Sequence, residues 1–136
     1  MQFSSVFCAA IMAVSVSAVR VSWDSGYDRA SRSLAEVACS DGKTGLMPKY
    51  QKQGDLRNFP NIGGTDAIAG WGSTNCGSCY KLQYNGASIK VLAIDHAGSG
   101  FNIGQTAMNA LTNGRAVEFG QVDATVTRLT PKDCGL

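Results

Sequence analysis

Cysteine content constrains the fold of this chain more than any other feature. The chain has 136 residues and five cysteines, of which Cys8 lies in an apolar N-terminal segment; the other four are Cys39, Cys76, Cys79 and Cys134. An even number of cysteines in a short exported chain predicts two disulfides, with three possible pairings. Each bridge restricts the unfolded chain and contributes about 2–5 kcal/mol, which matters in a domain too small for a large core.

The N-terminal segment predicts export. Residues 1–18 carry no charged side chain, and the apolar run 6–14 is followed by Val16-Ser17-Ala18. Such a run is too short to span a bilayer and ends in small residues of the kind that signal peptidase accepts. We therefore expect a signal peptide over residues 1–18 and a secreted domain over residues 19–136. No linker, repeat or low-complexity tract divides the latter, which predicts a single domain.

The spacing Cys76-Gly77-Ser78-Cys79 also occurs in redox dithiols and in zinc sites. A zinc site would need two more ligands, whereas the chain has one histidine, His96, and no second Cys-x-x-Cys. A thioredoxin-like site needs a βαβ setting that the sequence does not show. We therefore expect structural disulfides, and neither a metal nor a cofactor.

Charge argues against two classes of partner. The 12 basic and 10 acidic residues give a formal net charge of +2, and they are scattered without a block of one sign. Nucleic acids and anionic membranes are recognised by basic patches or stripes. The sequence therefore predicts neither a nucleic-acid partner nor a membrane partner.

Short alternating segments, together with 16 glycines, predict a mainly β fold. The expected strands are residues 19–23, 68–71, 80–84, 88–95 and 121–129. The turn Asn85-Gly86 predicts a hairpin between the third and fourth of these. One helix is expected over residues 106–111, ended by Asn113-Gly114, with a further helical turn within 31–37. Five or six short strands with two disulfides suggest a compact closed barrel.

Asp95 is the best candidate for chemistry. It ends the apolar run 89–94 and precedes the glycine-rich loop 97–100. A glycosidase would need a second carboxylate about 5–5.5 Å away for retention or about 6.5–9.5 Å for inversion. Asp41 and Asp24 are available, but each lies in a turn-like context in which aspartate commonly caps the backbone. The alternative role for Asp95 is structural, as an acceptor of hydrogen bonds from loop amides.

Other catalytic chemistry is disfavoured. The single histidine and the absence of a strand-turn-helix motif around a serine exclude a serine or cysteine nucleophile of the usual kind. We assign His96 no catalytic role and expect a loop residue. Trp23, Trp71 and Tyr80 could stack on pyranose rings, but in so small a chain we expect all three in the core, Trp71 beside the disulfides above all.

Across residues 19–136 the chain resembles the cerato-platanin family of secreted fungal proteins. Two positions depart from the family pattern: Trp23 stands where tyrosine is common, and Tyr80 where tryptophan is common. The resemblance is carried by the order and spacing of the following segments: Val21-Ser22-Trp23-Asp24, Gly26-Tyr27-Asp28, Val37-Ala38-Cys39-Ser40-Asp41-Gly42, Gly45-Leu46, Phe59-Pro60-Asn61-Ile62-Gly63-Gly64, Ile68-Ala69-Gly70-Trp71, Asn75-Cys76-Gly77-Ser78-Cys79, Ala93-Ile94-Asp95, Gly100-Phe101-Asn102-Ile103 and Cys134-Gly135.

The resemblance implies a fold, a disulfide pairing and a site. The fold is the six-stranded double-psi β-barrel of expansins and family 45 endoglucanases, with one or two short helices. The pairing is Cys39 with Cys76 and Cys79 with Cys134. The site is a shallow groove for N-acetylglucosamine oligomers, and its residues are Asp95 and Asn102, with Asp41, Gly42 and Leu82 nearby.

The resemblance also implies a function. We expect a monomeric, non-catalytic protein of the extracellular space or fungal cell wall that binds chitin or cellulose-type oligosaccharides and loosens polysaccharide as expansins do. It would also be an elicitor and virulence factor, detected at the plant cell surface by receptors. Two alternatives remain: a glycoside hydrolase of the family 45 type that uses Asp95, and a surface-active structural protein of the fungal wall that self-assembles at interfaces.

Overall fold

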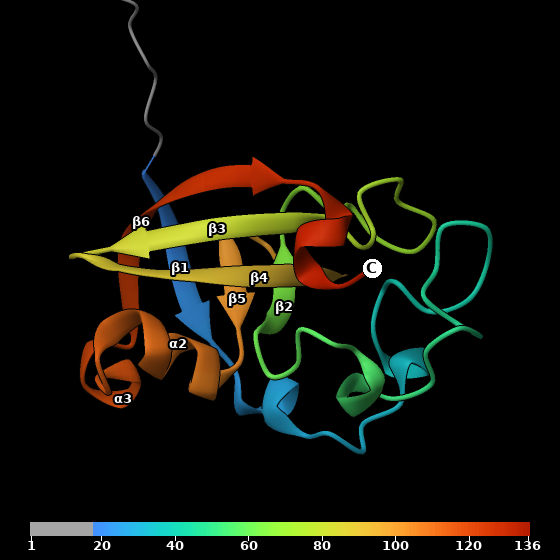
Figure 1. Ribbon diagram of the computed structural model, residues 1–136, viewed down its shortest axis with the longest axis horizontal. Coiled ribbons are helices and arrows are strands. Elements are labelled where there is room, and N and C mark those ends of the chain that lie inside the picture. The colour runs from blue at the N-terminus through green and yellow to red at the C-terminus, as the bar shows by residue number, and fades with distance from the viewer. Residues whose placement is uncertain (1–17) are drawn as a thin grey trace, which may run out of the picture.

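The computed structural model describes residues 18–136, in which six strands close into a barrel (Figure 1). The predicted signal peptide lies outside these residues, apart from Ala18. The strands are β1 (Ala18–Trp23), β2 (Ile62–Thr65), β3 (Cys79–Tyr84), β4 (Ala87–His96), β5 (Phe101–Ile103) and β6 (Gln121–Leu129). Their order around the barrel is β1-β5-β2-β4-β3-β6. Closure leaves no strand edge unpaired, so each strand has a partner on both sides.

The barrel combines two parallel pairs with four antiparallel ones. β1 runs parallel to β5 and β2 parallel to β4, whereas the other four pairs are antiparallel. The prediction of a mainly β, six-stranded double-psi barrel is confirmed. No helix in residues 18–136 is both long and apolar enough to cross a membrane.

Local signals placed the hairpin and the main helix correctly. Asn85 and Gly86 join β3 to β4 with φ values of +48° and +88°, as a two-residue turn with both residues in the left-handed region requires. Helix α2 (Gln105–Thr112) covers the predicted segment 106–111, and the left-handed Asn113 ends it. A second short helix, α3 (Ala116–Phe119), follows.

Four 3₁₀ turns complete the described part of the chain: η1 (Ser25–Asp28), η2 (Leu34–Glu36), η3 (Gln53–Asp55) and η4 (Pro131–Cys134). The second of them lies within 31–37, where a helical turn was expected. Asp28, in η1, accepts hydrogen bonds from the backbone N–H groups of Gln105 and Thr106, which caps the start of α2.

The strand predicted over residues 68–71 is wrong. Ile68 is fully buried, but its segment is a loop, and the strand at this place in the barrel is β2. Its Gly63-Gly64 pair hides the alternating pattern. Glycine is needed there because a Cβ on Gly64 would lie 2.9 Å from the carbonyl oxygen of His96, and one on Gly63 would collide with the backbone of Asn102.

Apolar side chains on alternate strand positions fill the barrel. In β6, Val122 and Ala124 are buried and their neighbours Gln121 and Asp123 are exposed, as the alternation predicted, whereas Thr125 and Val126 are both half-buried. Ala107, Met108 and Leu111 of α2 are buried too, and α2 packs against β4 and β3. Each large aliphatic side chain removed from water in this way contributes about 1.5–3 kcal/mol.

Two disulfides tie the loops to this core, with the pairing that the resemblance implied. Cys39 is bonded to Cys76, and Cys79 to Cys134. The first bridge joins two long segments that we call the first loop (residues 37–47) and the second loop (residues 66–78). The second bridge anchors η4 to the first residue of β3.

Candidate functional site

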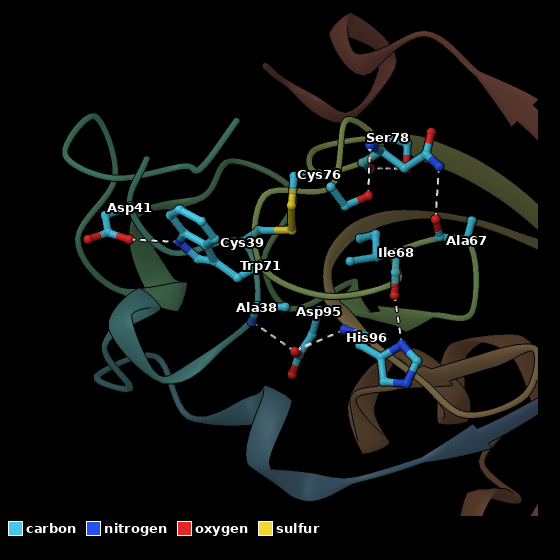
Figure 2. The surroundings of a disulfide bond; sticks show 12 residues. Ala38, Cys39, Asp41, Ala67, Ile68, Trp71, Cys76, Ser78, Asp95 and His96 are labelled. Atoms are coloured by element: carbon cyan, nitrogen blue, oxygen red, sulfur yellow. Dashed lines mark hydrogen bonds between the residues drawn. A yellow bond between two sulfur atoms is a disulfide. The ribbon is translucent and has the colours of Figure 1, made fainter. Parts of the chain in front are cut away.

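The last two residues of β4 hold both loops in place. The half-buried Asp95 accepts hydrogen bonds at Oδ1 from the backbone N–H groups of Ala38 and His96, each 2.9 Å long (Figure 2). Its Oδ2 accepts a third, of 2.8 Å, from the hydroxyl of Tyr27. Asp95 therefore has a structural role, although its donors are Tyr27, Ala38 of the first loop and His96 of β4 rather than amides of the loop after β4. A carboxylate has about four acceptor sites, which leaves one on Oδ2.

Tyr27 keeps its proton in this pair. Burial, followed by the charge of Asp95 and the hydrogen bond to it, raises the pKa of the Tyr27 phenol well above its ordinary value. The phenol is therefore a donor to Asp95 across the neutral pH range.

His96 anchors the second loop. Its Nδ1 lies 2.7 Å from the carbonyl oxygen of Ile68 (Figure 2). Because a carbonyl can only accept, Nδ1 carries a proton and Nε2 is the nitrogen left over. His96 is exposed. The hydrogen bond to Ile68 gives it a structural role, whereas the sequence assigned it none.

Trp71 lies on the surface, which contradicts the prediction that it belongs to the core. Its side chain is 66% exposed. Its indole N–H donates a 2.8 Å hydrogen bond to Oδ1 of Asp41 (Figure 2). The ring lies against Gly42, where a Cβ would come within 2.8 Å of the indole. These contacts hold the ring against the first loop, which the Cys39–Cys76 bridge ties to the second loop.

The other two aromatic side chains do pack against the core, as predicted. Trp23 is half-buried and donates its indole N–H to the carbonyl oxygen of Ala116, 2.7 Å away. Tyr80 is buried and meets Phe101 edge to face, with ring centres 5.0 Å apart.

Strand register brings Asp95 and Asn102 into one row. Gly64 of β2 pairs with Asp95 on one side and with Asn102 of β5 on the other, and Asn102 pairs with Ser22 of β1. We call Ser22, Asn102, Gly64 and Asp95 the polar row. Two strand spacings, roughly 10 Å, separate Asp95 from Asn102, and the residue between them has no side chain.

Asn102 keeps donors free within the polar row. Its Oδ1 accepts a 3.0 Å hydrogen bond from the hydroxyl of Ser22, whereas its NH₂ group has no partner among residues 18–136. Asn102 is half-exposed between the buried Phe101 and Ile103, as expected for an outward position on β5.

Three predicted site residues remain. Asp41 and Gly42 lie beside Trp71, and we call these three residues the Trp71 surface; Leu82 does not reach any surface. Asp41 and Gly42 hold the indole, as described. Leu82 is fully buried on β3, opposite Ile89 and Val126. Its side chain is part of the barrel core, so the expectation that Leu82 lies beside a bound sugar is wrong.

The carboxylates considered as partners of Asp95 have other roles. Asp24 accepts a 2.8 Å hydrogen bond from the N–H of Gly26 and so caps η1, while Asp41 is bonded to Trp71. The three donors around Asp95 make it an acceptor rather than a proton donor in this arrangement. Within residues 18–136, no three His, Cys, Asp or Glu side chains are grouped closely enough to hold a metal ion.

Comparison with known proteins assigns the family. The family model described as Cerato-platanin matches residues 19–136. This chain belongs to the cerato-platanin family. Cerato-platanins are secreted fungal proteins, and within residues 18–136 the structure has the family's barrel and its two disulfides.

Individual cerato-platanins agree with this assignment. The chain is 50% identical over 116 residues to Allergen Asp f 15 of Aspergillus fumigatus, covering 85% of this chain and 76% of that protein. It is 42% identical over 113 residues to cerato-platanin of Ceratocystis fimbriata f. sp. platani, covering 82% of each. The crystal structure of cerato-platanin 2 from M. perniciosa superimposes with a TM-score of 0.86 at 43% identity, covering 88% of this chain and 100% of that one. The solution structure of the fungal elicitor cerato-platanin gives a TM-score of 0.79 at 39% identity, covering 85% of this chain and 96% of that one.

Sequence reasoning missed three contributors to this cerato-platanin site. Tyr27 contacts Asp95, which is 68 positions further along the chain, and Ser22 contacts Asn102, which is 80 positions further along. No local sequence pattern identifies contacts of this kind. Gly64 carries a usable signal, because glycine within a strand often marks a close backbone approach, although no strand was predicted over residues 62–65.

Proposed function

We propose that this cerato-platanin is a secreted, non-catalytic carbohydrate-binding protein that binds chitin or cellulose-type oligosaccharides and loosens polysaccharide as expansins do. The observation that carries the proposal is the exposed and immobilised ring of Trp71. A flat indole that is already held in place loses little freedom when a sugar ring stacks on it. Tryptophan, which combines a large apolar ring with an N–H donor, is enriched at binding interfaces.

The polar row supports the same class of ligand. Asp95 has one acceptor site left and Asn102 has a free NH₂ group, so together they match hydroxyl and acetamido groups, which both donate and accept. Gly64 between them adds no side-chain bulk. Carboxylates that bind sugar in this way act by hydrogen bonding and need no change of protonation.

Hydrolysis is the weaker proposal for this site. A retaining or inverting glycosidase needs one protonated carboxyl and a second carboxylate facing it. Asp95 is surrounded by three donors, and Asp24 and Asp41 are engaged in contacts of their own. We therefore expect reducing-end release from chitin and from cellulose to be the same for the natural protein and for Asp95→Asn. Release that depends on Asp95 would favour the hydrolase.

The two tryptophans provide a built-in test of sugar binding. The chain contains only Trp23 and Trp71, so a ¹⁵N spectrum has two indole N–H signals. On titration with chitotriose or cellotriose, the Trp71 signal should shift and the Trp23 signal, whose N–H is bonded to Ala116, should not. The absence of any shift at Trp71 with both trimers would contradict the proposal.

We also propose that the protein acts as an elicitor of plant defence. The support is its similarity to the protein whose solution structure is described as a fungal elicitor. Infiltration of leaves with the natural protein and with Trp71→Ala separates two versions of this proposal. Equal responses would place the recognised surface away from the sugar-binding ring, whereas loss of the response would place it there.

A further inference from the structure

A cleft lies at the opposite end of β4 from Asp95, between the β3–β4 turn and the two helices. One cavity, of about 160 Å³, is lined by residues from the end of β3, the turn, the end of α2 and α3. A wider one, of about 420 Å³, shares Tyr84 and Phe119 with it and extends along the start of β6. We call the two together the hairpin cleft; the residues used below are Tyr84, Asn85, Asn113, Arg115, Phe119 and Gln121. The wider cavity falls in the size range of small-molecule sites, about 300–1,000 Å³.

The floor of the hairpin cleft is aromatic. Tyr84 and Phe119 are both half-buried and meet edge to face, with ring centres 6.3 Å apart and an angle of 71° between the rings. The guanidinium of Arg115 lies 5.7 Å from the centre of the Phe119 ring. The two rings therefore fix each other and present apolar surface to the cavities on both sides.

Polar groups without partners surround this floor. In the described part of the chain, the Tyr84 hydroxyl, the side-chain amides of Asn85 and Asn113, and the guanidinium of Arg115 make no hydrogen bond or ion pair. Thr112, which also lines the cleft, is satisfied within the fold: its hydroxyl donates to the carbonyl oxygen of Met108 and accepts from the backbone N–H of Arg115. A few convergent polar groups over an apolar floor are the general pattern of a ligand site.

The balance of donors and acceptors indicates the ligand class. Tyrosine hydroxyl and asparagine amides both donate and accept, and Arg115 only donates. The last residues of α2, Leu111 and Thr112, line the cleft, and the negative end of the helix dipole there disfavours an anion. Hydroxyl-rich neutral rings suit this mixture, whereas a carboxylate or phosphate would need donors alone. We propose that the hairpin cleft is a second saccharide site that takes a neutral pyranose unit.

Its position makes the protein bivalent. Ala87, which lines the cleft, and Asp95 are eight residues apart on one extended strand, or about 26 Å. Figure 1 shows the β3–β4 turn above α2 and α3 on the left, and the second loop on the right. One molecule could therefore hold two polysaccharide chains at once; this consequence, unlike the site itself, rests on the function proposed for the Trp71 surface.

Backbone conformation supplies a clean variant. Asn85 and Asn113 have φ values of +48° and +58°, which glycine adopts without strain. The triple variant Asn85→Gly, Asn113→Gly, Arg115→Gln therefore removes two side-chain amides and one positive charge and keeps the turn and the helix end. Arg57→Gln is the matched control, because it removes one positive charge beside a different cavity.

Titration of ¹⁵N-labelled protein with chitotriose and cellotriose tests the site. The amides of Gly86 and Gly114 should shift in the natural protein and in Arg57→Gln, whereas the triple variant should bind there at least about tenfold more weakly. The Trp71 indole signal should respond equally in all three. No shift at Gly86 and Gly114 with either trimer, an unchanged affinity in the triple variant, or shifts only with a galacturonate trimer would each overturn the inference.

The same spectra keep the two proposals apart. In Trp71→Ala, shifts at Gly86 and Gly114 should persist, since that residue lies at the other end of the barrel. If the natural protein responds at the hairpin cleft and not at Trp71, the second site stands and the proposed function of the Trp71 surface fails. Bivalency predicts that the natural protein cross-links suspended chitin particles, and that both Trp71→Ala and the triple variant bind the particles without cross-linking them. Equal cross-linking by all three would refute bivalency.

Discussion

The hydroxyl of Tyr27 donates a 2.8 Å hydrogen bond to Asp95, which joins the segment after β1 to the end of β4. Tyr27 is 5% exposed, so this donor has little access to water. Asp95 in turn receives the N–H of Ala38 at the start of the first loop. Tyr27 and Asp95 thus connect the barrel to the first loop, whose residues Asp41 and Gly42 contact the Trp71 ring.

Tyr27→Phe should lower the free energy of unfolding by about 1.5–3 kcal/mol at neutral pH, because a hydrogen bond to a charged group is lost while the ring remains. Urea denaturation measures the effect. Tyr50→Phe is the control. Within residues 18–136 the Tyr50 hydroxyl makes no hydrogen bond, and its ring is half-buried against the core. An equal loss in both variants would show that the Asp95 contact contributes nothing specific.

The same pair predicts sensitivity to alkali. The pKa of Tyr27 is raised above the ordinary tyrosine value of 10.0, so above that pH the unfolded chain loses this proton while the folded chain keeps it. The unfolded state then binds fewer protons, and stability falls as pH rises. Below pH 10 the contribution is fully present. Denaturation between pH 9 and pH 11 should show a steeper fall for the natural protein than for Tyr27→Phe; parallel curves would contradict the raised pKa.

Asp95→Ala should reduce both stability and sugar affinity. Its removal leaves the Tyr27 hydroxyl and the Ala38 N–H without their acceptor, at about 1–3 kcal/mol for each buried group. At this chain length such a loss lowers Tm by several degrees. Glu118→Ala is the control, because Glu118 is an exposed carboxylate on α3 that lines neither cavity of the hairpin cleft and makes no hydrogen bond in residues 18–136. Calorimetry that finds the same Tm for Asp95→Ala and the natural protein would deny Asp95 its structural role.

Trp71→Ala should separate binding from folding. An exposed side chain contributes little to stability, so we expect a change below about 1 kcal/mol in the free energy of unfolding. Affinity for chitotriose should fall about tenfold or more, because the stacking surface is lost. Calorimetric titration and urea denaturation give the two values. A stable variant with unchanged affinity would move the sugar site elsewhere.

Removing each disulfide in turn should have different consequences. Cys39→Ala with Cys76→Ala unties the two loops that hold Trp71, and should cost about 2–5 kcal/mol of stability together with sugar affinity. Cys79→Ala with Cys134→Ala should cost a similar stability and keep the affinity, since that bridge anchors η4 instead. The sugar affinity of each double variant is measured at a temperature below the Tm of the less stable one. Equal losses of affinity would argue against a specific role for the loops.

Sequence alone determined the features that depend on neighbours along the chain. Asn85-Gly86 predicted the hairpin, Asn113-Gly114 the end of α2, and the alternation over 121–129 the buried face of β6. These succeed because turn residues and period-two patterns act through local backbone preferences. The number of disulfides also followed from cysteine content, whereas their pairing came from the family resemblance.

Only the tertiary structure decided the features that depend on distant backbone and side chains. β2 forms where Gly63 and Gly64 allow the backbones of Asn102 and His96 to approach, a contact that hydrophobic patterning cannot show. Exposure of Trp71 follows from Asp41 and Gly42 on another loop, so composition alone assigned it wrongly to the core. Asp95 was found from its place at a strand end, but its three hydrogen-bond partners come from positions 27, 38 and 96, and closure of the barrel is what brings them together.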